Sequence, residues 1–167
     1  MTREMADWKI CFNWMLENED MARAYAVVPD APPGAHAVSG INSAAFPAQF
    51  AAIAALSQDQ RGPAVEQFYR QEFWSKWFDA LTSDELAKRV FDAAVNMGAG
   101  TAWRILQGAL GIHVDGLPGP LTVNEANSYA DAVQDFIAGR KAHYEAIIDA
   151  HPEDARYEDA WLDRAGK

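Results

Sequence analysis

The segment from Val27 to Gly40, VVPDAPPGAHAVSG, limits the fold more than any other part of this 167-residue chain. Its three prolines and two glycines exclude an α-helix, because proline lacks the amide donor and glycine weakens the helical backbone. The sequence on both sides of it has helical periodicity instead. We therefore expect a small lobe, a loop with a short hairpin at its end, that follows the first helix of a mainly α-helical protein.

The remaining chain is predicted to be helical in six segments. Trp8, Phe12, Met15 and Leu16 place one apolar face on the first helix. Later helices are expected over residues 46–56, 64–78, 82–97, 101–111 and about 130–150, and residues 151–167 follow the last of them. Thr82 and Glu85 fit a capping box at the start of the fourth helix, Gly98 fits its end, and Thr122 fits a cap after the turn DGLPGP.

Composition excludes several classes of function. The formal charge of −10 argues against a nucleic-acid-binding protein and against adsorption to an anionic membrane, since both require clustered cations. The four histidines are not spaced as metal ligands and the single cysteine, Cys11, allows no internal disulfide. No cofactor motif is present, so we expect neither a metal nor a cofactor.

Three carboxylates stand at the end of the first helix, in FNWMLENEDM: Glu17, Glu19 and Asp20. At about 100° per residue, Glu19 continues the apolar stripe of Met15 and Leu16, whereas Glu17 points to the opposite side. Burial and the negative end of a helix both favour a neutral carboxyl group, which is the form that a general acid needs. Glu19 is therefore the candidate acid, and the alternative is a surface residue in the last turn.

Residues 90–122, VFDAAVNMGAGTAWRILQGALGIHVDGLPGPLT, resemble the V-F-D-x-x-V-N-x-G, A-x-x-x-L-Q-x-x-L-G and D-G-x-x-G-P-x-T runs of the glycoside hydrolase family 108 lysozymes. FYRQEFW, RKAHYEAI and WLDRA resemble other segments of the family, in the same order. In that family a glutamate in an L-x-x-E-G-G-Y pattern ends the first helix and acts as the catalytic acid. The resemblance implies this role for Glu19, while Asp20 and Met21 replace the two glycines.

The resemblance implies a single lysozyme-like domain over residues 1–167, with a catalytic part over about 8–90 and a peptidoglycan-domain-like helical part over about 91–165 packed with it. It implies a muramidase that cleaves the β-1,4 bond between N-acetylmuramic acid and N-acetylglucosamine in peptidoglycan glycan strands. The alternatives are a lytic transglycosylase, or a catalytically silent peptidoglycan-binding protein suggested by the missing glycines.

Further site residues are expected around Glu19. Asp30 is the candidate second carboxylate, and its alternative is a turn residue before prolines. Ser39, Asn42 and Ser43 could instead position the water without a second carboxylate. Substrate contacts are expected from Ser39, Asn42, Tyr69, Trp74, Asp92 and Asn96. The aromatic residues could instead belong to the core, and Asp92 with Asn96 could instead form a buried hydrogen-bond network.

The setting follows from the N-terminus and from the family. MTREMADWKI lacks the apolar region of a signal peptide, and no apolar stretch approaches the roughly 20 residues of a membrane span. We expect a monomer made in the cytoplasm that acts in the periplasm or cell wall. The resemblance implies a phage endolysin released through a holin.

Overall fold

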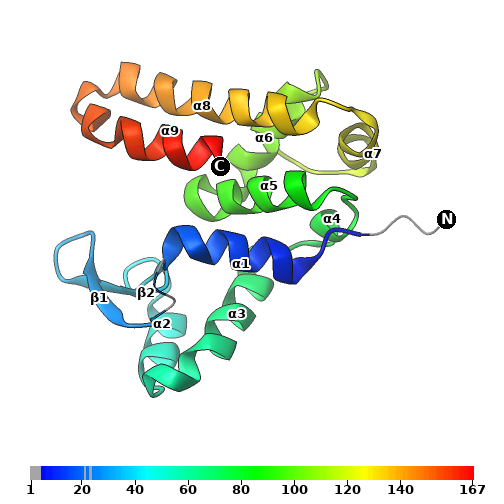
Figure 1. The fold of residues 1–167 in the computed structure, drawn as a ribbon. Helices are drawn as coiled ribbons and strands as arrows, with labels where there is room; N and C mark the ends of the chain where they lie inside the picture. The colour runs from blue at the N-terminus through cyan, green and yellow to red at the C-terminus, as the bar shows by residue number, and fades with distance from the viewer. Residues whose placement is uncertain (1–4, 21, 23) are drawn as a thin grey trace. The chain divides into compact units, whose positions relative to one another are not determined.

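The computed structural model describes residues 5–20, 22 and 24–167, and the fold is mainly α-helical and lysozyme-like (Figure 1). A three-stranded antiparallel sheet follows the first helix, which confirms the predicted fold class. No helix in the described residues combines the length and the apolarity that a membrane crossing requires. The elements are α1 (Trp8–Glu19), β1 (Val27–Asp30), β2 (Ala35–Val38), β3 (Ile41–Asn42), α2 (Pro47–Ala54), η1 (Gln58–Gln60), α3 (Arg61–Glu72), α4 (Lys76–Asp79), α5 (Asp84–Met97), α6 (Ala99–Ala109), α7 (Pro120–Ser128), α8 (Ala132–Ala150), η2 (Pro152–Tyr157) and α9 (Glu158–Gly166).

The chain forms two compact units. The sheet unit is Phe12–Trp74, and the helical unit comprises the residues up to Cys11 together with Ser75–Lys167. Helix α1 contributes to both units, since the division falls between Cys11 and Phe12. The organisation as one domain stays a prediction, and each unit is described by itself below.

In the sheet unit, the strands lie in the order β1-β2-β3, and Val38 of β2 pairs with Val27 of β1 and with Ile41 of β3. The hairpin between β2 and β3 has only Ser39 and Gly40 in its turn, with φ angles of 47° and 81°. Two consecutive positive φ angles define the tight turn that fits the twist of antiparallel strands. This Ser39–Gly40 turn is the part of the sheet that contacts the candidate site.

The sheet unit is closed by an aromatic cluster on α2 and α3. The ring of Phe68 lies edge-on to Phe46 at 4.9 Å and to Tyr69 at 5.2 Å, and Phe73 completes the cluster. Arg61 joins the two helices, because its guanidinium donates hydrogen bonds to the carbonyls of Ala54 and Leu56 as well as to Tyr25. These contacts fix α3 and the loop before β1 in one arrangement.

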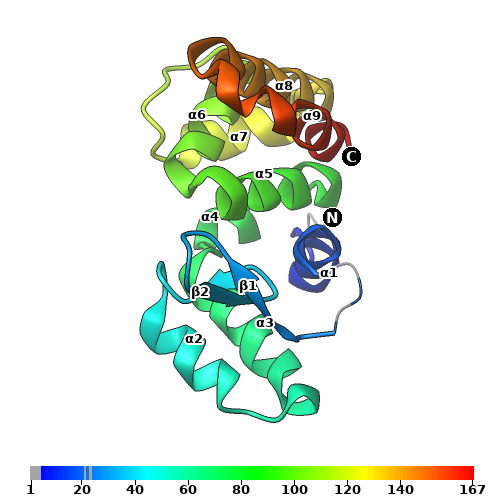
Figure 2. The same cartoon turned by 90° about the vertical axis from the view of Figure 1, so that its left-hand side faces the viewer.

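In the helical unit, α5 contacts α6 and α8, and α8 contacts α9. Both views of the ribbon show α9 lying along α8 (Figures 1 and 2). The hydrophobic face of α5 explains this central position, because Leu86, Val90, Phe91 and Ala94 are all buried. The prediction of a helix over this segment that ends at Gly98 is confirmed.

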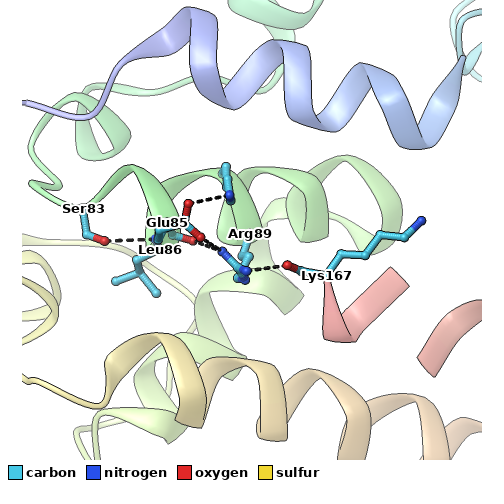
Figure 3. A network of polar contacts seen from close by, with 6 residues as sticks. Ser83, Glu85, Leu86, Arg89 and Lys167 are labelled. Carbon is cyan, nitrogen blue, oxygen red and sulfur yellow. Dashed lines mark hydrogen bonds and ion pairs between the residues drawn. The ribbon is translucent and has the colours of Figure 1, made fainter. Parts of the chain in front are cut away.

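The predicted capping box at the start of α5 is wrong by one residue. Ser83 is the N-cap, and its hydroxyl accepts a hydrogen bond from the amide of Leu86 at 3.2 Å (Figure 3). Glu85 instead contacts Lys88 and Arg89, and Arg89 also donates to the carbonyl of Lys167 (Figure 3). These two cations hold the pKa of Glu85 below its usual value, with the bond to Lys88 contributing most.

Two other helix predictions need correction. The expected helix over 64–78 is interrupted, since α3 ends at Glu72 and the short α4 begins at Lys76 with Ser75 as its cap. Thr122 is not a cap, because α7 already begins at Pro120 and Gly119 takes the cap position. Both Ser75 and Gly119 have the extended backbone that an N-cap requires, and residue type alone does not reveal it.

Asp92 is the polar centre of the helical unit. It is fully buried, and its carboxylate forms ion pairs with Arg140 of α8 at 2.7 Å and with Arg164 of α9 at 2.8 Å. Tyr144 extends the network, because it lies within 3.4 Å of Arg140 and donates to the side chain of Asn96. A buried carboxylate requires such compensation, so this network couples three helices.

We expect Asp92→Ala to lower the free energy of unfolding by about 3–5 kcal/mol, because it leaves the buried Arg140 without its ion pair. Urea unfolding followed by circular dichroism measures the loss. The matched control is Asp163→Ala, which removes an exposed pair with Lys167 and should cost no more than about 1 kcal/mol. Equal losses in the two variants would contradict the bracing role of Asp92.

Candidate functional site

Glu19 is the last residue of α1 and is partly buried, whereas Glu17 is exposed. Phe12, Met15 and Leu16 are buried in the same helix, so Glu19 does continue their stripe toward the interior. The partial burial of Glu19 is therefore consistent with the predicted inward orientation of its side chain. A catalytic role of Glu19 is a separate matter and stays a prediction.

The carboxylate of Glu19 lies directly against the Ser39–Gly40 turn. A Cβ atom at Gly40 would stand 2.7 Å from Oε2 of Glu19 and 2.8 Å from the hydroxyl of Tyr69. Real Cβ atoms do not approach other atoms so closely, so a side chain at position 40 would displace the end of Glu19 or of Tyr69. Gly40 therefore brings together a carboxylate from α1 and a phenol from α3 on one side of a strand turn.

Two hydrogen bonds fix the turn from opposite directions. The hydroxyl of Tyr69 donates to the backbone carbonyl of Ser39 at 2.7 Å. The hydroxyl of Ser39 donates to the carboxylate of Asp20 at 2.8 Å. Asp20 also accepts hydrogen bonds from the amides of Ala24 and Tyr25, at 3.1 and 2.9 Å. The residue after Glu19 is thus the anchor for both the following loop and the turn.

This arrangement gives a physical account of the substitution at position 20. The family pattern predicts glycine there, and Asp20 adds three accepted hydrogen bonds that glycine cannot make. Met21, the second departure from the pattern, lies outside the described residues. The backbone of Tyr25 is held in addition by Arg61, at 2.7 Å from its carbonyl.

Asp30 lies at the other end of β1 and is exposed. One of its carboxylate oxygens accepts a hydrogen bond from the amide of Ala31 at 2.8 Å, and the other accepts from the side chain of Asn42 at 2.7 Å. Asn42 also donates to the carbonyl of Ala31 and accepts from the amide of Ala44, both at 2.7 Å. The structure thus brings Asp30 and Asn42 together, in contacts that also stabilise two turns.

The aromatic candidates differ in their surroundings. Tyr69 is buried, its hydroxyl lies against Gly40 as the Glu19 carboxylate does, and its ring centre is 6.1 Å from that of Phe12. Trp74 is also largely buried, and the guanidinium of Arg70 lies 5.3 Å from its ring centre. Contact with Arg70 takes up ring surface that a sugar would need. Of the two aromatic candidates, Tyr69 is therefore the one that borders the same turn as Glu19.

Asp92 and Asn96 belong to the helical unit described above. Asp92 has no exposed surface and Asn96 is exposed but bonded to Tyr144, which favours the bracing network over a sugar-binding role. Sequence reasoning leaves both possibilities open, because a polar pair four residues apart beside an apolar stripe fits either one.

Sequence reasoning missed the importance of Gly40 and Asp20. The dipeptide Ser39–Gly40 between apolar residues is a signal for a two-residue hairpin turn, and this signal could have identified Gly40. Nothing in the sequence alone indicates that Asp20 reaches Ser39, since 19 residues separate them. That contact depends on how the loop returns to α1.

Cys11, the cysteine of this chain, is buried. Burial, followed by the negative charge of Asp84, raises the pKa of Cys11 to about 12, so it remains an unreactive thiol at neutral pH. Within residues 5–20, 22 and 24–167, no three His, Cys, Asp or Glu side chains are grouped as metal ligands. The Glu19 carboxylate, with the Ser39–Gly40 turn and Tyr69, is thus the candidate site.

Comparisons with known proteins agree with this fold and region. The structure is similar to that of SagA from Brucella abortus, with a TM-score of 0.70 and 20% sequence identity over 95% of this chain and 88% of that chain. At this level of identity the likeness shows a shared fold. No curated protein matches the sequence.

Residues 14–98, about half of the chain, match the family Glycosyl hydrolase 108, and this range includes Glu19, Gly40 and Tyr69. This family match, together with the lysozyme-like fold, places the protein among the glycoside hydrolases that act on peptidoglycan. The chain belongs to the Glycosyl hydrolase 108 family, as the sequence motifs indicated.

We expect Gly40→Ala to displace the Glu19 carboxylate. The loss in free energy of unfolding should exceed the cost of a left-handed backbone at a non-glycine residue, which is about 1–2 kcal/mol. Gly34→Ala is the matched control, because Gly34 has a similar φ of 91° and a Cβ added there would meet no atom within 4 Å. Thermal unfolding of both variants separates the collision from the backbone effect. Equal losses would show that Glu19 and Tyr69 do not press on Gly40.

Proposed function

We propose that the protein is a muramidase that hydrolyses the β-1,4 bond between N-acetylmuramic acid and N-acetylglucosamine, with Glu19 as the general acid. The observation that carries the proposal is the close contact of the Glu19 carboxylate with the Gly40 backbone at the end of α1. A catalytic acid must be held in one geometry, and the Gly40 backbone borders the carboxylate on one side. The family match over residues 14–98 includes Glu19 and supports the proposal.

The proposed reaction has one proton donor and one water. Glu19 transfers its proton to the glycosidic oxygen while the bond from this oxygen to the anomeric carbon of N-acetylmuramic acid breaks. Water adds to the anomeric carbon and loses a proton to a second carboxylate, and N-acetylglucosamine leaves with a free hydroxyl group. Tyr69 contributes by holding the turn that borders Glu19.

Asp30 is the second carboxylate in this proposal, with Asn42 orienting it. Asp30 stands three residues along β1 from Val27, whose partner Val38 precedes the Ser39–Gly40 turn. We propose inversion at the anomeric carbon, by a water that loses its proton to Asp30.

The remaining candidates take supporting roles. The contacts described above favour Ser39 and Asp92 as residues that position others. Asn42 orients Asp30. Trp74 and Asn96 stay predictions as sugar contacts, and their contacts with Arg70 and Tyr144 favour supporting roles instead. Action as a monomer on the cell wall, as a phage endolysin released through a holin, completes the proposal.

The decisive measurement is clearing of chloroform-treated Gram-negative cells by the purified protein and by Glu19→Gln. We expect the variant to lose nearly all activity, because the amide of glutamine is too weak an acid to protonate the glycosidic oxygen. Glu17→Gln is the matched control, as an exposed carboxylate of the same helix two residues away. Full activity of Glu19→Gln would refute the mechanism, and an inactive wild type would indicate a binding protein.

Analysis of the released muropeptides tests the chemistry. Reducing ends that form first as the α-anomer, detected by NMR, are expected for inversion of a β-linkage. Asp30→Asn should then reduce the rate without changing the helical circular dichroism signal. An anhydro product would instead identify a lytic transglycosylase, and a β-anomer would exclude inversion.

Asp20→Gly provides a separate test, since it restores the glycine that the family pattern predicts. We expect this variant to be less active than the wild type, because the Ser39–Gly40 turn loses its carboxylate anchor. Ser39→Ala removes the same bond and leaves Asp20 bound to the loop amides, so it should lose less activity. A gain of activity in Asp20→Gly would contradict the anchoring role.

A further inference from the structure

A second concave surface lies between α2 and α3 of the sheet unit. It is a groove of about 160 Å³ whose floor is apolar, with Ile53 and Phe68 as the largest side chains. Its rim carries polar residues, namely Gln49, Gln67, Gln71 and Glu72. This volume is smaller than the roughly 300–1,000 Å³ of pockets for drug-sized ligands, so the groove suits a single ring.

The floor of the groove is preformed. Phe68 is buried, and its ring is held by edge-on contacts with Phe46, Tyr69 and Phe73. Ile53 is buried beside it on α2, and Arg61 ties α2 to the start of α3. A binding surface that is already ordered loses less entropy when a ligand binds.

The rim offers hydrogen bonds that the protein does not use. In the described part of the chain, the side-chain amides of Gln49, Gln67 and Gln71 have no hydrogen-bond partner. Each amide supplies donors and an acceptor without a charge. Glu72 carries the only formal charge among the lining residues, which disfavours an anionic ligand.

The groove is separate from the candidate catalytic site. Tyr69, which borders Glu19, lies on α3 between Gln67 and Gln71, and each glutamine is two residues away from it. Two residues along a helix correspond to a rotation of about 200°, so both glutamines face away from the side that carries Tyr69. A ligand in the groove would therefore not contact Glu19.

We propose that this groove is a second carbohydrate site, which binds one neutral N-acetylated amino sugar of a glycan strand. Sugar hydroxyl and acetamido groups match the three amides and the Glu72 carboxylate, while the apolar floor accepts a methyl group or a ring face. The choice of an amino-sugar glycan rests on the proposed function. A second site on the same glycan holds the enzyme on its polymer between cleavage events.

The test is NMR mapping of the full chain with N-acetylglucosamine tetramer as the probe, in the Glu19→Gln background so that the probe is not cleaved. We expect saturable shifts of the side-chain amide signals of Gln49, Gln67 and Gln71 and of the Ile53 methyl signals. Gln67→Ala/Gln71→Ala should raise the dissociation constant reported by Ile53 about tenfold, because two hydrogen-bonding groups are removed from the groove.

The control is Gln134→Ala, an exposed glutamine on α8 that does not line the groove. It should leave the shifts of Ile53 and their midpoint unchanged. Absence of shifts at the groove amides, or an unchanged dissociation constant at Ile53 in the double variant, would overturn the proposal. Shifts that depend on protein concentration without the probe would assign the groove to self-association and would overturn it as well.

The outcomes separate this inference from the proposed muramidase activity. Saturable groove shifts together with a wild type that does not clear cells would support the sugar site and refute the catalytic proposal. Efficient clearing without groove shifts would support the catalytic proposal and refute the sugar site. In an active enzyme, Gln67→Ala/Gln71→Ala should slow the clearing of intact wall while leaving the rate on short chitooligosaccharides unchanged.

Discussion

The positive φ angles of Ser39 and Gly40 are the constraint on which the candidate site depends. They reverse the chain between β2 and β3 within two residues, and so bring a backbone without a side chain against Glu19 and Tyr69. The conformation is unfavourable for serine, and it is held by the bond from Ser39 to Asp20 and by the bond from Tyr69 to the Ser39 carbonyl. Helix α1, the sheet and α3 thus meet at one turn.

Asp20 changes how the departure from the family pattern is interpreted. In the family pattern, two glycines follow the glutamate and let the backbone turn freely. In this chain Asp20 directs the turn instead, because its carboxylate accepts hydrogen bonds from Ala24, Tyr25 and Ser39. The substitution replaces flexibility with specific contacts. It therefore offers a physical alternative to the idea that the missing glycine silences the site.

Periodicity was sufficient to predict the helices with one long apolar face, such as α1 and α5, and prolines and glycines were sufficient to exclude helix from 27–40. Helix ends were less predictable, because Ser83 and Thr82 are equally good caps until the backbone is known. The break between α3 and α4 has no proline or glycine to signal it. Within the site, the burial of Glu19 follows from helical geometry, but the Asp20–Ser39 bond depends on tertiary structure.

The buried carboxylate of Asp92 has a consequence for the order in which the protein is made. The sheet unit is one continuous stretch, Phe12–Trp74, so all its residues are synthesised before Asp92 and its two arginine partners. Asp92 must wait for Arg140, and then for Arg164, which follows Asp92 by 72 residues. Since a half-compensated buried charge is costly, the helical unit reaches its stable packing only after α9 has left the ribosome. A nascent chain halted before Arg164 would thus contain every residue that surrounds Glu19, together with an unfinished bundle.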